Sequence, residues 1–247
     1  MACVARQTRC CTWHDFCERD SSLVTTVLAI FVKTPGLSPI KTRLAASIGQ
    51  RAATEFHCLA ARAVAEVAGA TGDGLRPCWA VAERAALGDP LWSDLPTLWQ
   101  GEGPLGERLH RIYGTLQAVH ERVLLVGADT PQITPALLDR AVDVLRPNDA
   151  RFVMGAARDG GFWLFGGRAP IAHETWCGVR YSQPDTATQL RKALRLRDGA
   201  TALPVLGDVD TAQDLPPLAD ALDALTDPLP GQHVLRRWLQ HTFASAA

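Results

Sequence analysis

The stretch Val27-Leu28-Ala29-Ile30-Phe31-Val32, followed by Lys33-Thr34-Pro35-Gly36-Leu37-Ser38-Pro39, indicates the fold class. Its first six residues are apolar and mostly β-branched or aromatic, which is typical of a parallel strand buried on both faces. The prolines and the glycine then end the strand, and apolar residues recur at helical spacing from Leu44 to Val67. The stretch therefore predicts a buried strand, a Pro/Gly loop and one long helix.

Strands and helices alternate along the rest of the chain in the same way. The further strands expected are residues 77–82, 97–99, 122–126, 152–155, 162–165 and 202–206. The further helices expected are residues 105–119, 136–145 and 185–196, and a C-terminal helix with Val234, Leu235, Trp238 and Leu239. Four residues of the helix over 105–119 are expected to face the core: Leu109, Ile112, Leu116 and Val119.

This alternation predicts an α/β fold of three layers, in which a mainly parallel sheet has helices on both faces. Ligands of such folds bind at the carboxyl ends of the strands. The loops after Val32, Val126 and Leu206 should therefore meet and form the site.

The 247 residues are expected to form a single domain over residues 24–247, preceded by a disordered extension over residues 1–23. The extension lacks periodicity and holds four of the seven cysteines: Cys3, Cys10, Cys11 and Cys17. A zinc site with His14 is the alternative, although the extension has no Cys-x-x-Cys pair. An odd number of cysteines also argues against a disulfide framework.

Composition favours a small-molecule partner over a nucleic acid or a membrane. Hydrophobic residues make up 47% of the chain and charged residues 21%, the formal net charge is -1, and no block of Lys and Arg stands out. The longest apolar run, residues 27–32, is too short to span a bilayer, and the first twenty residues lack the apolar segment of a signal peptide. We therefore expect a cytoplasmic protein without membrane insertion, and the sequence leaves a homo-oligomer open.

Lys41-Thr42-Arg43 lies at the predicted start of the first helix. The free N–H groups and the dipole of a helix N-terminus favour a phosphate, and the two cations add to this preference. The loop is not a Walker A motif, because Ile40 stands where that motif has a glycine before the lysine. The alternative is that Lys41 and Arg43 are solvated surface groups.

Asp129 follows a buried strand, at the place where an α/β sheet presents its ligands. A carboxylate there suits Mg²⁺ or Mn²⁺ bridging a diphosphate, although Asp129 could also just start the turn into Pro131. Asp159-Gly160-Gly161 is likewise compatible with a plain hairpin turn. The segment Asp210-Thr211-Ala212-Gln213-Asp214 is first of all typical of a capped helix N-terminus with an acidic first turn.

Five motifs between residues 27 and 215 carry a family resemblance. They are residues 31–36 with 41–44, 100–101 with 105–109, 127–131, 159–162, and 208–214. In this order they resemble a bacterial family of GT-A-fold proteins described as glycosyltransferases, some of them assigned to arsenosugar biosynthesis. The chain departs from that family at Pro104, where Asp is usual, and at Ala156-Ala157-Arg158, where a Pro and a Glu usually precede the aspartate.

The resemblance implies a nucleotide-diphospho-sugar transferase fold, related to molybdenum-cofactor and phospholactate guanylyltransferases, with a nucleotide over the first loop. The residues it implies for the nucleotide and its phosphates are Lys33, Gly36, Lys41, Arg43, Gln100 and Arg108. Asp129 matches the metal-associated aspartate of such folds, so the resemblance implies a divalent metal, Mg²⁺ or Mn²⁺. Asp129 and Asp159 are the catalytic residues it implies.

Three functions fit these observations. In glycosyl transfer, a metal on Asp129 with Lys41 and Arg43 would stabilise a departing nucleoside diphosphate while a small acceptor takes the sugar. In nucleotidyl transfer, a triphosphate would bind at the same site and pyrophosphate would leave. A non-catalytic nucleotide-binding protein is the third hypothesis, because Arg158 directly precedes Asp159, where the family usually has an acidic residue, and no catalytic base is evident.

Overall fold

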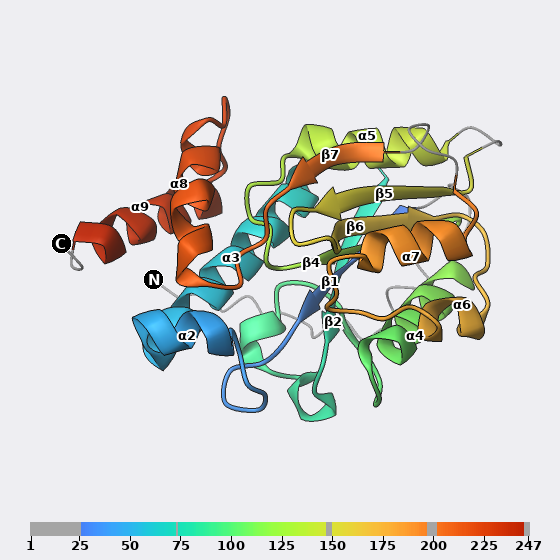
Figure 1. Ribbon diagram of the computed structural model, residues 1–247, viewed down its shortest axis with the longest axis horizontal. Helices are drawn as coiled ribbons and strands as arrows, with labels where there is room; N and C mark the ends of the chain where they lie inside the picture. The colour runs from blue at the N-terminus through green and yellow to red at the C-terminus, as the bar shows by residue number, and fades with distance from the viewer. Residues whose placement is uncertain (1–25, 73, 147–149, 197–201, 245–247) are drawn as a thin grey trace, which may run out of the picture.

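The computed structural model describes residues 26–72, 74–146, 150–196 and 202–244 (Figure 1). The expected extension over residues 1–23 lies outside these residues, and so do Cys3, Cys10, Cys11, Cys17 and His14 with the zinc site they could form. The strands are β1 Thr26–Val32, β2 Leu75–Val81, β3 Thr97–Trp99, β4 Arg122–Gly127, β5 Phe152–Ala157, β6 Phe162–Gly167 and β7 Ala202–Leu206. The helices are α2 Thr42–Ile48, α3 Gln50–Ala70, α4 Leu105–Gln117, α5 Pro135–Leu145, α6 His173–Cys177, α7 Thr186–Ala193, α8 Leu215–Asp223 and α9 Pro230–Ala244.

The strands form one sheet in the order β3-β2-β1-β4-β6-β5-β7. β1 pairs in parallel with β2 and with β4, and β7 pairs in parallel with β5. Only β6 runs against its neighbours, because it returns from β5 through the Asp159-Gly160 turn and then pairs with β4. The predicted mainly parallel sheet is confirmed, with β6 as its antiparallel member.

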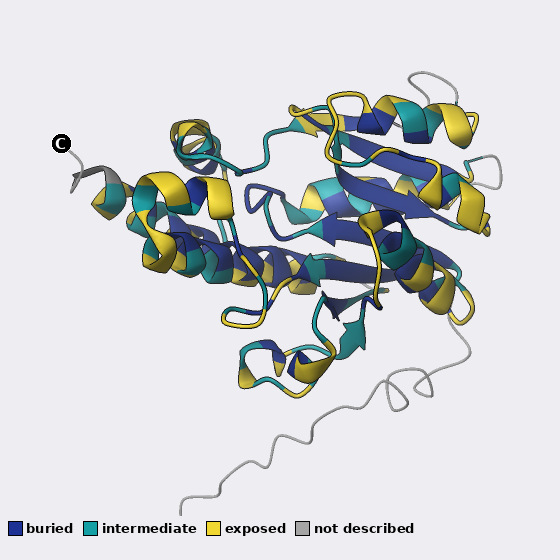
Figure 2. Cartoon of the chain, turned by 60° about the horizontal axis from the view of Figure 1, so that its bottom comes forward, coloured by how far each residue is buried: buried dark blue, intermediate teal, exposed yellow. Residues whose placement is uncertain are grey.

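Successive residues of β1 point to opposite faces of the sheet, and each face is covered by helices (Figure 1). Leu28, Ile30 and Val32 pack with residues of α3 and α5. Val27 and Ala29 pack with residues of α4, α6 and α7 on the other face. The strands at the centre are therefore buried on both sides, which Figure 2 shows, and the three-layer architecture is confirmed.

The single long helix expected after the first loop is wrong. Gly49 interrupts it with φ 86°, so that α2 ends at Ile48 and α3 begins at Gln50. Apolar residues of both helices, among them Leu44 and Phe56, pack together with Leu235 and Leu239 of α9. The apolar periodicity thus continues across the break because both helices face the same small core.

Two further expectations fail at helix ends. α4 ends at Gln117, so Val119 lies beyond it with 52% of its surface exposed instead of facing the core. α7 covers only residues 186–193 of the expected 185–196, and the chain turns at Arg195 with φ 54°. Within the described residues, no helix combines the length and the apolar character that crossing a bilayer requires.

Candidate functional site

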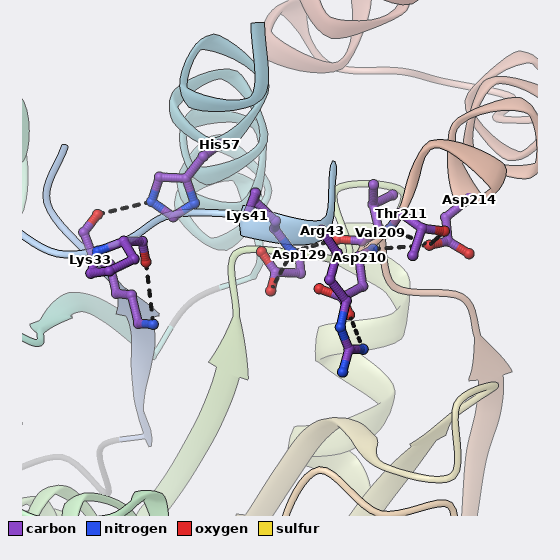
Figure 3. Close-up of polar contacts among 10 residues, drawn as sticks. Lys33, Lys41, Arg43, His57, Asp129, Val209, Asp210, Thr211 and Asp214 are labelled. Atoms are coloured by element: carbon purple, nitrogen blue, oxygen red, sulfur yellow. Dashed lines mark hydrogen bonds and ion pairs between the residues drawn. The ribbon is translucent and has the colours of Figure 1, made fainter. Parts of the chain in front are cut away.

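The loops after β1, β4 and β7 meet at the side chain of Lys41, as expected (Figure 3). Its Nζ lies 2.8 Å from Oδ2 of Asp129 and also donates a hydrogen bond to the carbonyl oxygen of Val209. The N–H of Val209 donates to the carbonyl oxygen of Asp129 at 3.1 Å. Lys41 and Asp129 therefore join three loops that follow three different strands.

Lys41 is held in an unusual backbone conformation. It is the N-cap residue of α2, with φ 46° and ψ 47°, in the left-handed region that non-glycine residues seldom occupy. Its side chain is only 8% exposed. The alternative that Lys41 is a solvated surface group is therefore wrong, because its ammonium group is buried and bound to a carboxylate.

A cavity of about 690 Å³ lies beside this junction. Its basic lining residues are Lys33, Lys41 and Arg108, and its acidic ones are Asp129 and Asp210. The starts of two helices also line it, α2 through Thr42 and α4 through Leu105, and neither start has a side-chain cap. Free N–H groups and an excess of cations make this cavity suitable for an anion.

Gln100 and Arg108 lie at the cavity as the resemblance implies, but Gln100 already has partners. Its Nε2 donates to the carbonyl oxygens of Val32 at 3.2 Å and Ala80 at 2.7 Å, so the buried amide ties the ends of β1 and β2 together. Arg108 donates through Nε to the carbonyl oxygen of Gly103 at 2.9 Å, and its Nη1 lies 3.5 Å from Oε1 of Gln100. Gln100 is thus placed to position Arg108.

Lys33 lines the cavity and is exposed, with Nζ 3.5 Å from the carbonyl oxygen of Pro39. Gly36 and Arg43 are not among the lining residues. Gly36 has φ 82° and forms the turn after β1, whereas Arg43 is 76% exposed and pairs with Asp210 at 2.7 Å. The structure therefore brings Lys33, Lys41, Gln100 and Arg108 to one cavity and leaves Gly36 and Arg43 outside its walls.

A second cavity of about 300 Å³ adjoins the first and shares four wall residues with it: Phe31, Leu105, Gly127 and Asp129. Its charged lining residues are all acidic, namely Asp129, Asp159 and Asp208. Phe162, Trp163 and Tyr181 give it an aromatic wall. Asp129 thus stands between a cavity with more cations than anions and a cavity with three carboxylates.

Asp159 occupies the hairpin turn that its sequence predicted. Its Oδ1 accepts a hydrogen bond from the N–H of Gly161 at 2.8 Å, and β5 and β6 pair on either side. Gly160 has φ 89°, and a Cβ there would lie 1.8 Å from the carbonyl oxygen of Pro184. The predicted hairpin turn is therefore confirmed, and it sets the Asp159 carboxylate at the wall of the second cavity.

Asp208 was not singled out from the sequence, although it belongs to the Asp208-Val209-Asp210 motif after β7. Burial, together with the negative charges of Asp159 and Asp129, raises the pKa of Asp208 to about 6. From the sequence, Asp208 can be recognised only as one of two aspartates, Asp208 and Asp210, that follow a strand. The environment that distinguishes it depends on β4 and β6, which are far away in the chain.

His57 is a second residue that the sequence did not reveal. It extends from α3 into the wall of the larger cavity, where its Nε2 lies 2.9 Å from the carbonyl oxygen of Lys33 (Figure 3). Because a carbonyl oxygen can only accept, Nε2 carries the proton. Burial lowers the pKa of His57, and the positive charges of Lys41 and Lys33 add to this effect while Asp129 opposes it.

The capping expected over Asp210–Asp214 is confirmed, and it gives Asp214 a structural role. Its Oδ2 accepts from the N–H groups of Asp210 and Thr211, at 3.0 and 2.7 Å, and from the Thr211 hydroxyl at 2.8 Å. Although burial opposes them, these hydrogen bonds keep the pKa of Asp214 below its usual value. The cap fixes the loop that carries Asp208, Val209 and Asp210.

The acidic residues around Asp129 do not form a closed metal site. In the part of the chain that the structure describes, no three His, Cys, Asp or Glu donor atoms that include Asp129 lie within 4.8 Å of one another. Mg²⁺ and Mn²⁺ nevertheless often bind through one or two carboxylates plus the phosphates of a substrate. Asp129 and its neighbouring carboxylates fit a cation that arrives with a phosphate.

Residues 51–183 match the family described as "Uncharacterized protein conserved in bacteria (DUF2064)". A search of curated proteins found no significant match.

Solved structures share the fold. A protein from Desulfovibrio desulfuricans G20, provisionally assigned as a nucleotide-diphospho-sugar transferase, superposes with a TM-score of 0.74 at 22% identity, over 89% of this chain and 97% of that one. A 4-diphosphocytidyl-2C-methyl-D-erythritol synthase superposes with a TM-score of 0.50 at 12% identity, over 89% of this chain and 100% of that one. At these identities the comparisons establish a nucleotide-diphospho-sugar transferase-like α/β fold, and the reaction has to be argued from the residues.

Proposed function

The chain belongs to the DUF2064 family, and we propose that it is a transferase that binds a nucleotide-diphospho-sugar in the larger cavity and passes the sugar to a small acceptor in the second one. The observation that carries the proposal is the pair of adjoining cavities with opposite charge, which share Asp129 in their common wall. The assignment of the Desulfovibrio protein to the nucleotide-diphospho-sugar transferases supports the same class.

The larger cavity is the proposed place of the nucleotide and its diphosphate. Lys33, Lys41 and Arg108 outnumber its two carboxylates, and the uncapped starts of α2 and α4 add partial positive charge. Gln100 holds Arg108 toward the ends of β1 and β2 through its three hydrogen bonds. In the proposal Lys41 and Arg108 contact the phosphates, whereas Gln100 acts as a positioning residue.

The second cavity is the proposed place of the sugar and its acceptor. Carboxylates accept hydrogen bonds from hydroxyl groups, and aromatic rings pack against the apolar face of a sugar ring. Asp159 and Asp208 supply the acceptors, and Phe162, Trp163 and Tyr181 supply the rings. Asp208, with its pKa raised to about 6, is in addition a candidate to take the proton that an acceptor hydroxyl loses.

Asp129 is the proposed metal ligand of the site, with Mg²⁺ or Mn²⁺ as the ion. A divalent ion there would neutralise phosphate charge and stabilise the departing diphosphate. The chain itself contributes the buried ammonium group of Lys41, which holds the Asp129 carboxylate 2.8 Å away at the boundary of the two cavities. Arsenosugar biosynthesis is a finer hypothesis that rests on the sequence resemblance alone.

The released product tests the proposal directly. The full chain is first screened by thermal shift against nucleotides and nucleotide sugars, with and without Mn²⁺, and stabilising donors are then incubated with small hydroxylated acceptors. Release of a nucleoside diphosphate is the expected result. Release of pyrophosphate from a triphosphate would instead identify a nucleotidyltransferase, and binding without any release would leave a nucleotide-binding protein.

A further inference from the structure

A cluster of side chains of metal-ligating types lies on the α4–α6 pair, apart from Asp129. Glu107 in the first turn of α4 faces His173 and Cys177, which are four residues apart on α6 and so share one side of it. His173 Nε2 lies 2.9 and 3.0 Å from the two Glu107 oxygens and 3.4 Å from the Cys177 sulfur. Within residues 26–72, 74–146, 150–196 and 202–244, this is the one group of three such donors within 4.8 Å of one another.

Close packing of the two helices holds these donors in place. A Cβ at Gly106 would lie 2.8 Å from the carbonyl oxygen of Trp176 and 3.3 Å from Cα of Cys177, so the helices can approach this closely only at a glycine. Trp176, between the two α6 donors, is fully buried. The His173 ring also packs edge-on against His110 at 5.0 Å, and Nδ1 of His110 is buried without a hydrogen-bond partner.

We propose that Glu107, His173 and Cys177 bind a transition-metal ion of the Zn²⁺ class. Zinc bond lengths of about 2.0 to 2.3 Å at a tetrahedral angle separate neighbouring donors by about 3.3 to 3.6 Å, so the observed 2.9 and 3.4 Å need an adjustment of only a few tenths of an ångström. The thiolate and the imidazole favour zinc over magnesium or manganese. The carboxylate and the thiolate balance the charge of the ion, and the thiol proton leaves to the buffer.

The ion would link α6 to the first turn of α4 through its ligands. Leu105 and Arg108 in that turn line the larger cavity, so this link would stabilise one wall of the proposed nucleotide site. Partial exposure of His173 and Glu107, with side chains 45% and 37% accessible, leaves a fourth position open to water.

Cobalt(II) absorption tests the site without any nucleotide, so its outcome does not depend on the proposed reaction. The full chain with Cys3, Cys10, Cys11 and Cys17 changed to serine removes the thiols of the N-terminal segment. Treated with chelator and then titrated with Co²⁺, it should bind one equivalent and show a near-ultraviolet thiolate-to-cobalt band, which Zn²⁺ abolishes and millimolar Mg²⁺ does not.

Adding Cys177→Ser should remove the band, and adding His173→Ala should weaken binding by at least about tenfold, since even outer-shell partners of metal ligands contribute about 10- to 100-fold. Cys58→Ser, which changes a free thiol on α3, is the matched control and should leave the titration unchanged. A band that survives Cys177→Ser, or no metal bound by the quadruple variant, would overturn the proposal. Circular dichroism of each variant shows that the fold is retained.

Discussion

Lys41 shows how one residue can hold a site together. Its ammonium group neutralises Asp129 and binds the Val209 carbonyl oxygen, and its left-handed backbone turns the chain into α2. The ammonium group is buried while the Asp129 side chain is 43% exposed, so the pair itself contributes little net stability, and removing Lys41 leaves the Asp129 carboxylate and the Val209 carbonyl oxygen without this partner. Lys41 therefore matters to the loops of the protein as well as to any phosphate that binds there.

Lys41→Ala should weaken nucleotide binding by about 1.5 to 3 kcal/mol, the range for hydrogen bonds to charged groups, which is roughly tenfold or more in Kd. It should also lower the melting temperature, because Asp129 loses its partner. Arg43→Ala is the matched control, since Arg43 is a neighbouring cation outside the cavity whose exposed pair with Asp210 contributes at most about 1 kcal/mol. Calorimetry measures the Kd of the nucleotide for both variants. Equal Kd values for Lys41→Ala and Arg43→Ala would show that Lys41 does not bind the phosphates.

His57 should make the free energy of unfolding depend on pH. Burial lowers the pKa of His57 in the folded state. As the pH is lowered through the unfolded pKa of about 6.5, the unfolded chain therefore binds the proton before the folded chain does, and the free energy of unfolding decreases. His57→Gln keeps a donor for the Lys33 carbonyl oxygen and removes this titration. Urea unfolding between pH 5 and pH 8 should then give a shallower decline for the variant, by at most about 1.4 kcal/mol per pH unit. If the free energy of unfolding depends on pH in the same way in the wild type and in His57→Gln, the lowered pKa of His57 is refuted.

At the scale of elements, the central strands could be predicted because burial on both faces leaves continuous apolar runs, as in β1 and β4. The break between α2 and α3 could not, since Leu44 and Phe56 keep one periodicity while packing against α9 from separate helices. The site, too, could be predicted only in part. The position of Asp129 after a buried strand predicts a functional carboxylate, but its pairing with Lys41 and the surroundings of Asp208 depend on loops that the sheet brings together.

The β5–β6 hairpin should depend on Gly160. In Gly160→Ala the new Cβ would meet the Pro184 carbonyl oxygen in a conformation with φ 89°, so we expect a loss of more than about 2 kcal/mol in unfolding free energy. Gly114→Ala on α4 is the control, because nothing lies within 4 Å of its Cβ position, and alanine should stabilise that helix by about 0.5 to 1 kcal/mol. Denaturant titration measures both, and an unaffected Gly160→Ala would show that the turn can relax.

For the whole molecule, the parallel sheet brings the ends of β1, β4 and β7 to one edge, and the two cavities open there on either side of Asp129. In the proposed function, the separation of charge between them would give each half of a nucleotide-diphospho-sugar its own environment. Asp129 already binds the Lys41 ammonium group, and Asp210 pairs with Arg43 outside the cavity, so Lys33 and Arg108 are the cations left for a diphosphate. A divalent ion between Asp129 and the diphosphate would add the positive charge that Lys41 shares with Asp129, so metal and nucleotide sugar should bind cooperatively.

The most direct measurement is a calorimetric titration of the full chain with uridine and guanosine diphosphate sugars, with and without Mn²⁺, in the wild type and in Asp129→Asn. The amide keeps the size of the side chain and removes its charge. Asp143→Asn, which changes an exposed carboxylate on α5, is the control and should bind like the wild type. We expect Mn²⁺ to tighten binding in the wild type and in Asp143→Asn, and this gain to be lost in Asp129→Asn with the fold intact. Binding that does not depend on Mn²⁺, or a metal-dependent gain that survives in Asp129→Asn, would show that Asp129 does not hold the metal.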